Sequence, residues 1–155
     1  MIDSIAAHAD VAAFQELLDA TPAGTEHVRI SDDAWTLAEI VGHLIDSASN
    51  NHQRFARLRL GDLSQFPGYD AEPWVRAQGY DACDFSMLAG LWANYNALLL
   101  HLAEATPDEA KANAWATPDG PATLEFLVAD YYRHLQDHTE HYRERLAEVQ
   151  ATAQA

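Results

Sequence analysis

Hydrophobic residues recur at steps of three and four along four long stretches of the chain, which is the spacing of one face of an α-helix. The first stretch runs from about residue 3 to residue 20 and the second from Thr36 to Leu60. The third starts near Asp84, and the fourth covers residues 123–150. The pattern predicts four amphipathic helices and no strand, so we expect an all-α fold, a four-helix bundle.

The connecting segments carry the signals that begin and end helices. Thr36 and Glu39 have the spacing of a capping box, in which each side chain accepts a hydrogen bond from a backbone N–H near the other. Residues 62–82 contain prolines, glycines and several aromatics, and we expect a long ordered loop between the second and third helices. The sequence predicts a single domain over residues 1–150, followed by a frayed tail at 151–155.

Charge and composition exclude several classes of partner. The 155 residues include 9 Lys and Arg against 24 Asp and Glu, a net charge of −15. Phosphate backbones and anionic membrane surfaces are also negative, so we expect neither nucleic acid nor membrane as a partner. The single cysteine, Cys83, gives no internal disulfide, and the N-terminal residues lack a signal-peptide pattern. We therefore expect a cytoplasmic protein.

Histidine is the unusual residue in this acidic chain, with eight copies. On a helical wheel with Leu127 at zero, His134 falls near −20°, His138 near +20° and His141 near −40°, at about 100° per residue. The apolar arc of the same helix spans about 0° to 100°, so all three share or border the inward face. His134 and His138 are one turn apart, which lets both imidazoles reach one ion.

His43 in the second helix is the candidate third ligand. It lies at the edge of the apolar arc, and its polar neighbours include Glu39, Asp46 and Arg54. The carboxylates could orient its second ring nitrogen, as carboxylates do around many metal-binding histidines. Three imidazoles from two helices would leave a fourth position for water or substrate. The alternative, that these histidines are hydrogen-bonded core residues without a metal, stays open at this point.

Several familiar catalytic motifs are absent. A zincin motif needs Glu after its first histidine, but Leu135 follows His134. The chain contains no Glu-x-x-His of the di-iron bundles, no Gly-x-Ser-x-Gly and no phosphate-binding glycine loop. His52 lies about 180° around the helix from His43 and cannot join it.

Two segments resemble the DinB/YfiT-like superfamily of metalloenzymes. They are residues 35–46 (WTLAEIVGHLID) and residues 130–138 (DYYRHLQDH), and the order of elements also fits over nearly the whole chain. The most specific part is a single histidine in the second helix followed by His-x-x-x-His in the last. The resemblance implies an up-down-down-up four-helix bundle, often dimeric, with a divalent metal held by His43, His134 and His138.

The same resemblance implies the function. Similar proteins include thiol S-transferases that use bacillithiol or mycothiol, a maleylpyruvate isomerase and many proteins described only as possible hydrolases. We therefore expect a metal-dependent enzyme, with zinc or nickel, that acts on a small organic substrate, which could be a low-molecular-weight thiol. Glu39 and Asp46 are candidates to orient ligands or move protons, and His141 is either such a residue or an alternative ligand. The alternative function is a bundle that binds a metal or small ligand without turnover.

A homodimer is also expected from the sequence. Val41, Ile45 and Leu60 are apolar but lie away from the core arc of the second helix, where they could face a partner. They could equally contact the long loop or the first helix, and the sequence leaves these alternatives open.

Overall fold

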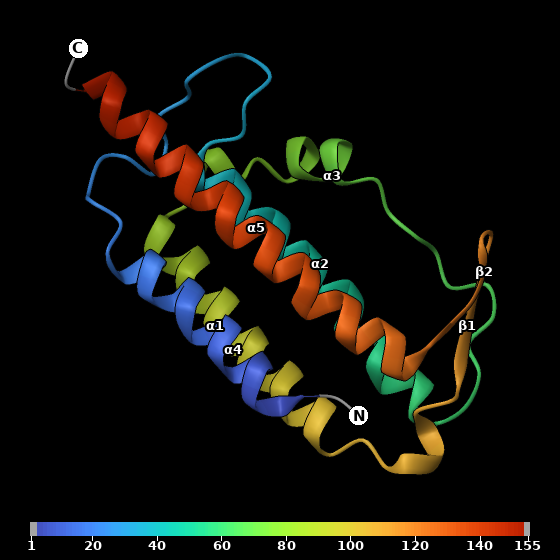
Figure 1. Cartoon of the computed structure of the whole chain (residues 1–155). Helices are drawn as coiled ribbons and strands as arrows, with labels where there is room; N and C mark the ends of the chain where they lie inside the picture. Colours follow the sequence, from blue (N-terminus) through green and yellow to red (C-terminus); the bar gives the residue numbers. More distant parts are fainter. Residues whose placement is uncertain (1–2, 154–155) are drawn as a thin grey trace.

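Four long helices form the body of the protein in the computed structural model, which describes residues 3–153 (Figure 1). They are α1 (Ser4–Asp19), α2 (Leu37–Leu58), α4 (Phe85–Glu104) and α5 (Leu124–Ala153). Figure 1 shows α1 and α5 running in one direction and α2 and α4 in the other, which is the expected up-down-down-up order. The all-α four-helix bundle is therefore confirmed. No helix within residues 3–153 combines the length and apolarity that crossing a bilayer would require.

Helix α2 is the central element, because it packs against both α4 and α5. Its capping box forms as predicted: Thr36 Oγ1 accepts from the Glu39 N–H at 3.2 Å, and Glu39 Oε2 accepts from the Thr36 N–H at 2.8 Å. All twelve residues from Leu37 to Ala48 are buried, so this half of the helix is covered on every side. A helix buried all round is fixed in position by its neighbours, and so are its polar side chains.

Aromatic packing joins the other helices to this centre. The Phe14 ring lies with its centroid 4.7 Å from that of Trp92 and 5.3 Å from that of Tyr142, both in edge-to-face geometry. In the same core the Tyr131 hydroxyl donates to Asn96 Oδ1 at 2.7 Å. These contacts tie α1, α4 and α5 into one core, in which Tyr131 and Asn96 pair with each other while the buried Nε1 of Trp92 has no partner among the described residues.

The segment predicted as a loop over residues 62–82 contains two short helices, α3 (Ala71–Gln78) and the 3-10 helix η1 (Tyr80–Ala82). The expectation of an unbroken loop was therefore wrong. Pro73 reads as a helix breaker, but it is the third residue of α3, where a backbone N–H has no partner inside the helix. Gly79 ends α3 with a φ of 62°, a left-handed conformation that glycine adopts without strain.

A second correction concerns strands, since the sequence predicted none. Strands β1 (Ala114–Thr117) and β2 (Gly120–Thr123) pair antiparallel, and Leu63 from the long connection pairs with Trp115 of β1. Four-residue strands are too short to show an alternating pattern, and only the pairing reveals them. The 3-10 helix η2 (Asp108–Ala110) precedes this hairpin.

The structure also bears on the predicted end of the last helix and on the apolar residues proposed for a dimer. Helix α5 continues to Ala153, three residues past its predicted end, while residues 154–155 of the expected tail lie outside the described residues. Val41 and Ile45, which the sequence left open for a dimer partner, are 0% and 6% exposed within the single chain. Only Leu60 of that set is exposed, so the dimer stays a prediction without support from the other two.

The contact between Gly42 and Tyr80 yields a stability prediction. A Cβ on Gly42 would stand 2.1 Å from Cδ2 of the Tyr80 ring, so Gly42→Ala must push η1 away from α2. We expect this variant to lose about 1–3 kcal/mol of unfolding free energy, as overpacked cores do. Chemical denaturation followed by circular dichroism measures the change.

Gly90→Ala is the matched control, because Gly90 is also inside a helix and a Cβ there would meet nothing within 4 Å. It should gain roughly 0.5–1 kcal/mol, since alanine favours helix more than glycine does. Equal stability of wild type and Gly42→Ala would contradict the close packing of η1 on α2.

Candidate metal centre

The structure brings three of the predicted residues together between α2 and α5. One nitrogen from each of His43, His134 and His138 lies within 4.8 Å of the other two. The Nε2 atoms of His43 and His134 are 3.2 Å apart. Two nitrogens bound to one tetrahedral zinc ion at 2.0–2.1 Å would be roughly 3.3 Å apart, so this spacing suits shared coordination.

The two helices fix the three rings from opposite sides. His134 and His138 are one turn apart on α5, and their ring centroids are 4.4 Å apart. The His43 ring on α2 lies with its centroid 4.5 Å from that of His138 and 5.1 Å from that of His134. Because α2 and α5 are packed along their lengths, the geometry is set by the fold and not by a flexible loop.

Burial keeps all three imidazoles neutral. The pKa of His43 is lowered to about 4, mainly by removal from water and in smaller part by the neighbouring His134 and His141. Burial likewise lowers the pKa of His138 to about 3, with contributions from His134 and His43, and it also lowers the pKa of His134. A neutral imidazole has a free lone pair, which is the form that binds a metal ion.

The ring nitrogens of the three histidines lack the hydrogen-bond partners that buried histidines normally have. The Nδ1 atoms of His43, His134 and His138 are buried and have no hydrogen-bond partner. A purely structural histidine in a core normally pairs its ring nitrogens with carbonyls or carboxylates. His43 and His134 instead face each other through Nε2, and a cation bound between the rings would replace this contact between two imidazole nitrogens.

Glu39 and Asp46, which the sequence offered as residues that orient His43, are engaged elsewhere. Glu39 accepts from the Thr36 N–H in the capping box and pairs with Arg29, whose Nη2 lies 2.8 Å from Oε1. Asp46 Oδ1 accepts from the Tyr80 hydroxyl and from Gln78 Nε2, each at 2.6 Å. Burial raises the pKa of the Asp46 carboxyl, and these two hydrogen bonds lower it. Neither carboxylate is hydrogen-bonded to His43.

Trp35 is the neighbour of the cluster whose role the sequence did not reveal. Its ring centroid lies 5.1 Å from that of His43 and 6.4 Å from that of His141. Its Nε1 donates to Glu72 Oε2 of α3 at 2.7 Å, and Arg145 of α5 donates to its carbonyl oxygen. Trp35 therefore connects α3 and α5 beside the three imidazoles, and its place at the start of the segment 35–46 was its signal in the sequence.

The remaining histidines lie outside the three-residue cluster. His141 is half-buried with its ring centroid 5.7 Å from that of His138, so it borders the cluster without joining it. His52 packs near Tyr95, with ring centroids 6.0 Å apart, away from His43 as predicted. His8 contacts Glu104 on the surface, and His101 is exposed.

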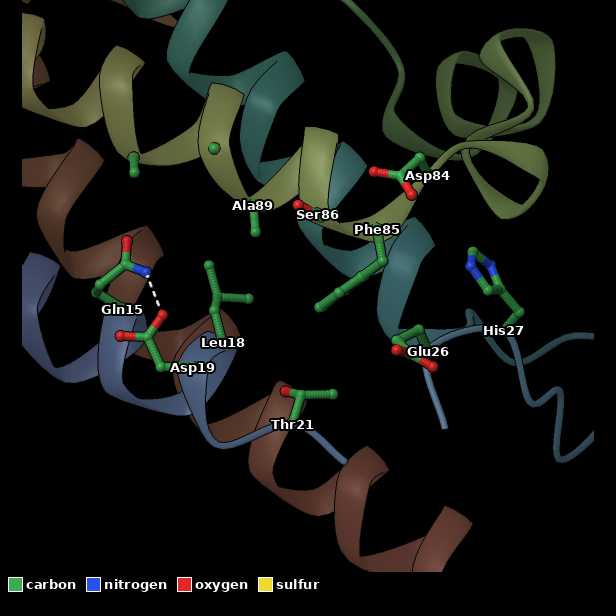
Figure 2. A pocket seen from close by; sticks show the side chains of 12 residues that line it. Gln15, Leu18, Asp19, Thr21, Glu26, His27, Asp84, Phe85, Ser86 and Ala89 are labelled. Atoms are coloured by element: carbon green, nitrogen blue, oxygen red, sulfur yellow. Dashed lines mark hydrogen bonds between the residues drawn. The ribbon is translucent and has the colours of Figure 1, made fainter. Parts of the chain in front are cut away.

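A cavity of about 560 Å³ lies elsewhere, between the end of α1, the start of α4 and the segment after α1. Figure 2 shows Asp19, Glu26 and Asp84 around it, with Gln15 donating to Asp19. His27 is its only histidine, and none of the three clustered imidazoles lines it. The cavity is therefore separate from the candidate metal centre.

An up-down-down-up helical bundle with three convergent imidazoles defines the class of the protein, and comparisons agree. The chain belongs to the DinB superfamily, whose family model matches residues 6–142. The structure is similar to YfiT from Bacillus subtilis, described as a probable metal-dependent hydrolase with an unusual four-helix bundle topology. That match has a TM-score of 0.79 at 21% identity and covers 92% of this chain and 82% of YfiT. A search of curated proteins finds no match.

The lowered pKa values give a pH prediction for metal-free protein. Between pH 6.5 and about 4 the unfolded chain binds protons at His43 and His138 that the folded chain does not bind. Unfolding free energy should therefore fall as the pH drops through this range, by about 1–2 kcal/mol per histidine from pH 6.5 to 5. Denaturation of EDTA-treated protein at both pH values measures it.

His138→Gln should flatten that dependence, because it removes one of the two groups. His101→Gln, which changes an exposed histidine, should leave the dependence unchanged. The same slope in wild type and His138→Gln would contradict a buried neutral cluster.

Proposed function

We propose that the protein is a divalent-metal-dependent enzyme, of the hydrolase or thiol S-transferase type, with His43, His134 and His138 as the metal ligands. One observation carries the proposal: three imidazoles from two helices, one buried and two partly buried, bring one nitrogen each within 4.8 Å of the others, and His43 and His134 face each other through Nε2. The relation to the DinB superfamily and the fold shared with YfiT support it.

Zinc and nickel are the ions we propose. Imidazole ligands suit both, and three of them leave a coordination position open. An ion held there lowers the pKa of a coordinated water or thiol, so that a nucleophile is available near neutral pH. The imidazoles can accept the ion at neutral pH without first losing protons, because burial already keeps them neutral.

Trp35, Asp46 and Tyr80 form the surroundings that a substrate would contact beside His43. Trp35 lies against the His43 ring and excludes water from that side. Asp46 and Tyr80 are locked to each other by a 2.6 Å hydrogen bond, so they hold η1 in place. We propose a small organic substrate, with a low-molecular-weight thiol as one candidate, and a cytoplasmic location, where such thiols remain reduced.

A second candidate function is metal or ligand binding without turnover. One observation favours it: neither Glu39 nor Asp46 is hydrogen-bonded to the imidazoles, so the cluster has no carboxylate paired with it as a proton acceptor. Ester, amide and thiol-transfer substrates assayed with and without zinc or nickel separate the two functions. Metal-dependent turnover supports the enzyme, and metal binding without any turnover supports the binding protein.

The metal content of the purified protein tests the proposed ligands. Protein produced without an affinity tag and dialysed against zinc should retain about one ion per chain, because three imidazoles form a complete protein donor set. His134→Ala should weaken zinc binding by more than about tenfold, since it removes a ligand. Elemental analysis and calorimetric titration measure both quantities.

His101→Ala is the control, because it removes an exposed histidine from α4. It should bind zinc as the wild type does. Zinc content that is the same in wild type and His134→Ala would show that the ion binds somewhere else.

A further inference from the structure

Arg54 of α2 is a buried cation without a carboxylate partner. It is 8% exposed, yet it forms no salt bridge with any residue of the described range 3–153. Burial lowers the pKa of its guanidinium, as expected for a charge removed from water. Five other arginines do pair with carboxylates: Arg29, Arg76, Arg133, Arg143 and Arg145. In a chain with net charge −15, the lack of an acidic partner at its buried arginine needs a reason.

The hydrogen bonds of Arg54 leave one edge of the guanidinium free. Nη1 donates to Asn51 Oδ1 at 3.4 Å, a long contact. Nε is buried and has no partner, and Nη2 makes no hydrogen bond with a residue in the described part of the chain. The Nε–Nη2 edge presents two parallel N–H groups, the geometry that binds the two oxygens of one carboxylate.

Aromatic rings from the long connection and the hairpin enclose this guanidinium. Its Cζ lies 4.4 Å from the centroid of the Trp115 ring and 6.0 Å from that of Phe66. Trp115 is held in place by the backbone pairing of β1 with Leu63, at the end of the bundle where α2 ends and α5 begins (Figure 1). Cation–π contacts stabilise the charge but satisfy none of its N–H donors. The enclosure therefore leaves the Nε–Nη2 edge of the guanidinium unpaired in aromatic surroundings.

Arg54 and the metal centre share one face of α2. Arg54 follows His43 by eleven residues, which is about 20° of rotation and roughly 16 Å along the helix. Tyr69 is near enough to feel the charges of both regions: burial raises the pKa of its hydroxyl, the charge of Asp46 raises it further, and the charge of Arg54 lowers it. Arg54 Nη1 contacts Asn51, one turn closer to His43, so the side chain extends along α2 in the direction of the imidazoles.

We propose that Arg54 binds a carboxylate group of the substrate through its Nε–Nη2 edge, with Trp115 and Phe66 packing against the adjacent apolar part. The assignment rests on the proposed function for the reaction itself, since it names the substrate class of the same site: extended carboxylic acids whose reacting group, at the end away from the carboxylate, reaches the three imidazoles. A buried guanidinium loses much of its hydration, and a bidentate carboxylate replaces it.

Benzoate is the probe for this site, and benzamide is the uncharged control of the same shape. Both are titrated by calorimetry into EDTA-treated full-length protein in phosphate-free buffer, so that no metal can bind the carboxylate. Intrinsic fluorescence gives a second readout, because Trp115, one of the four tryptophans, lies on the guanidinium. We expect benzoate to bind and benzamide to bind at least about tenfold more weakly, since a charge-assisted pair is lost.

Three variants assign the binding to Arg54. Arg54→Gln should weaken benzoate binding by at least about tenfold, and Arg54→Lys, which keeps the charge but loses the two-donor edge, should weaken it by about fivefold or more. Arg57→Gln is the matched control: Arg57 is exposed and also contacts the Phe66 ring, at 5.6 Å, and its loss should change binding less than about twofold. If Arg54→Gln does not fold, the Arg54→Lys comparison decides.

Failure of this proposal is distinguishable from failure of the metal site. His134→Ala should bind benzoate like the wild type, because the Arg54 edge does not depend on the metal. No benzoate binding to wild type, or equal binding by wild type and both Arg54 variants, would overturn the carboxylate site while leaving the zinc titration untouched. Inorganic phosphate binding more tightly than benzoate would also overturn the carboxylate assignment.

Discussion

The burial of the first half of helix α2 on all its sides is the constraint on which the rest of the structure depends. Its first half has no solvent-facing surface, so every polar side chain there must find a partner or a function. Glu39 and Asp46 have partners, in Arg29 and in Tyr80 with Gln78. His43 has only the imidazoles of α5. The same burial that removes water from α2 therefore produces both the neutrality and the unsatisfied nitrogens of the candidate metal centre.

The long connection between α2 and α4 covers the face of α2 on which both proposed sites lie. It brings α3 and η1 against the first half of α2, and it brings Phe66 against the second half, where β1 adds Trp115. Trp35 is hydrogen-bonded to α3 and packs on His43. The connection therefore covers α2 from the imidazoles to Arg54. A substrate that spans that distance would be held at a metal and at a guanidinium on the same rigid helix.

The sequence predicted the bundle and the imidazole cluster because both depend on periodicity along single helices. The stripe on α5 placed His134 and His138 inward, and the Thr36–Glu39 box set where α2 begins. It did not predict the hairpin, α3 or the partners of Asp46, because these arise from pairing between distant segments. The same holds for Val41 and Ile45. The sequence showed which side of the helix they occupy, but it did not show which segments of the chain bury them.

X-ray absorption spectroscopy on zinc-loaded or nickel-loaded protein tests the central claim most directly, because it reports the atoms bound to the ion. The account predicts a first shell that includes three imidazole nitrogens at about 2.0–2.1 Å and no sulfur from the protein, with one imidazole fewer in His43→Ala. A shell of carboxylate oxygens, or one unchanged in His43→Ala, would contradict the joining of α2 and α5 at one ion.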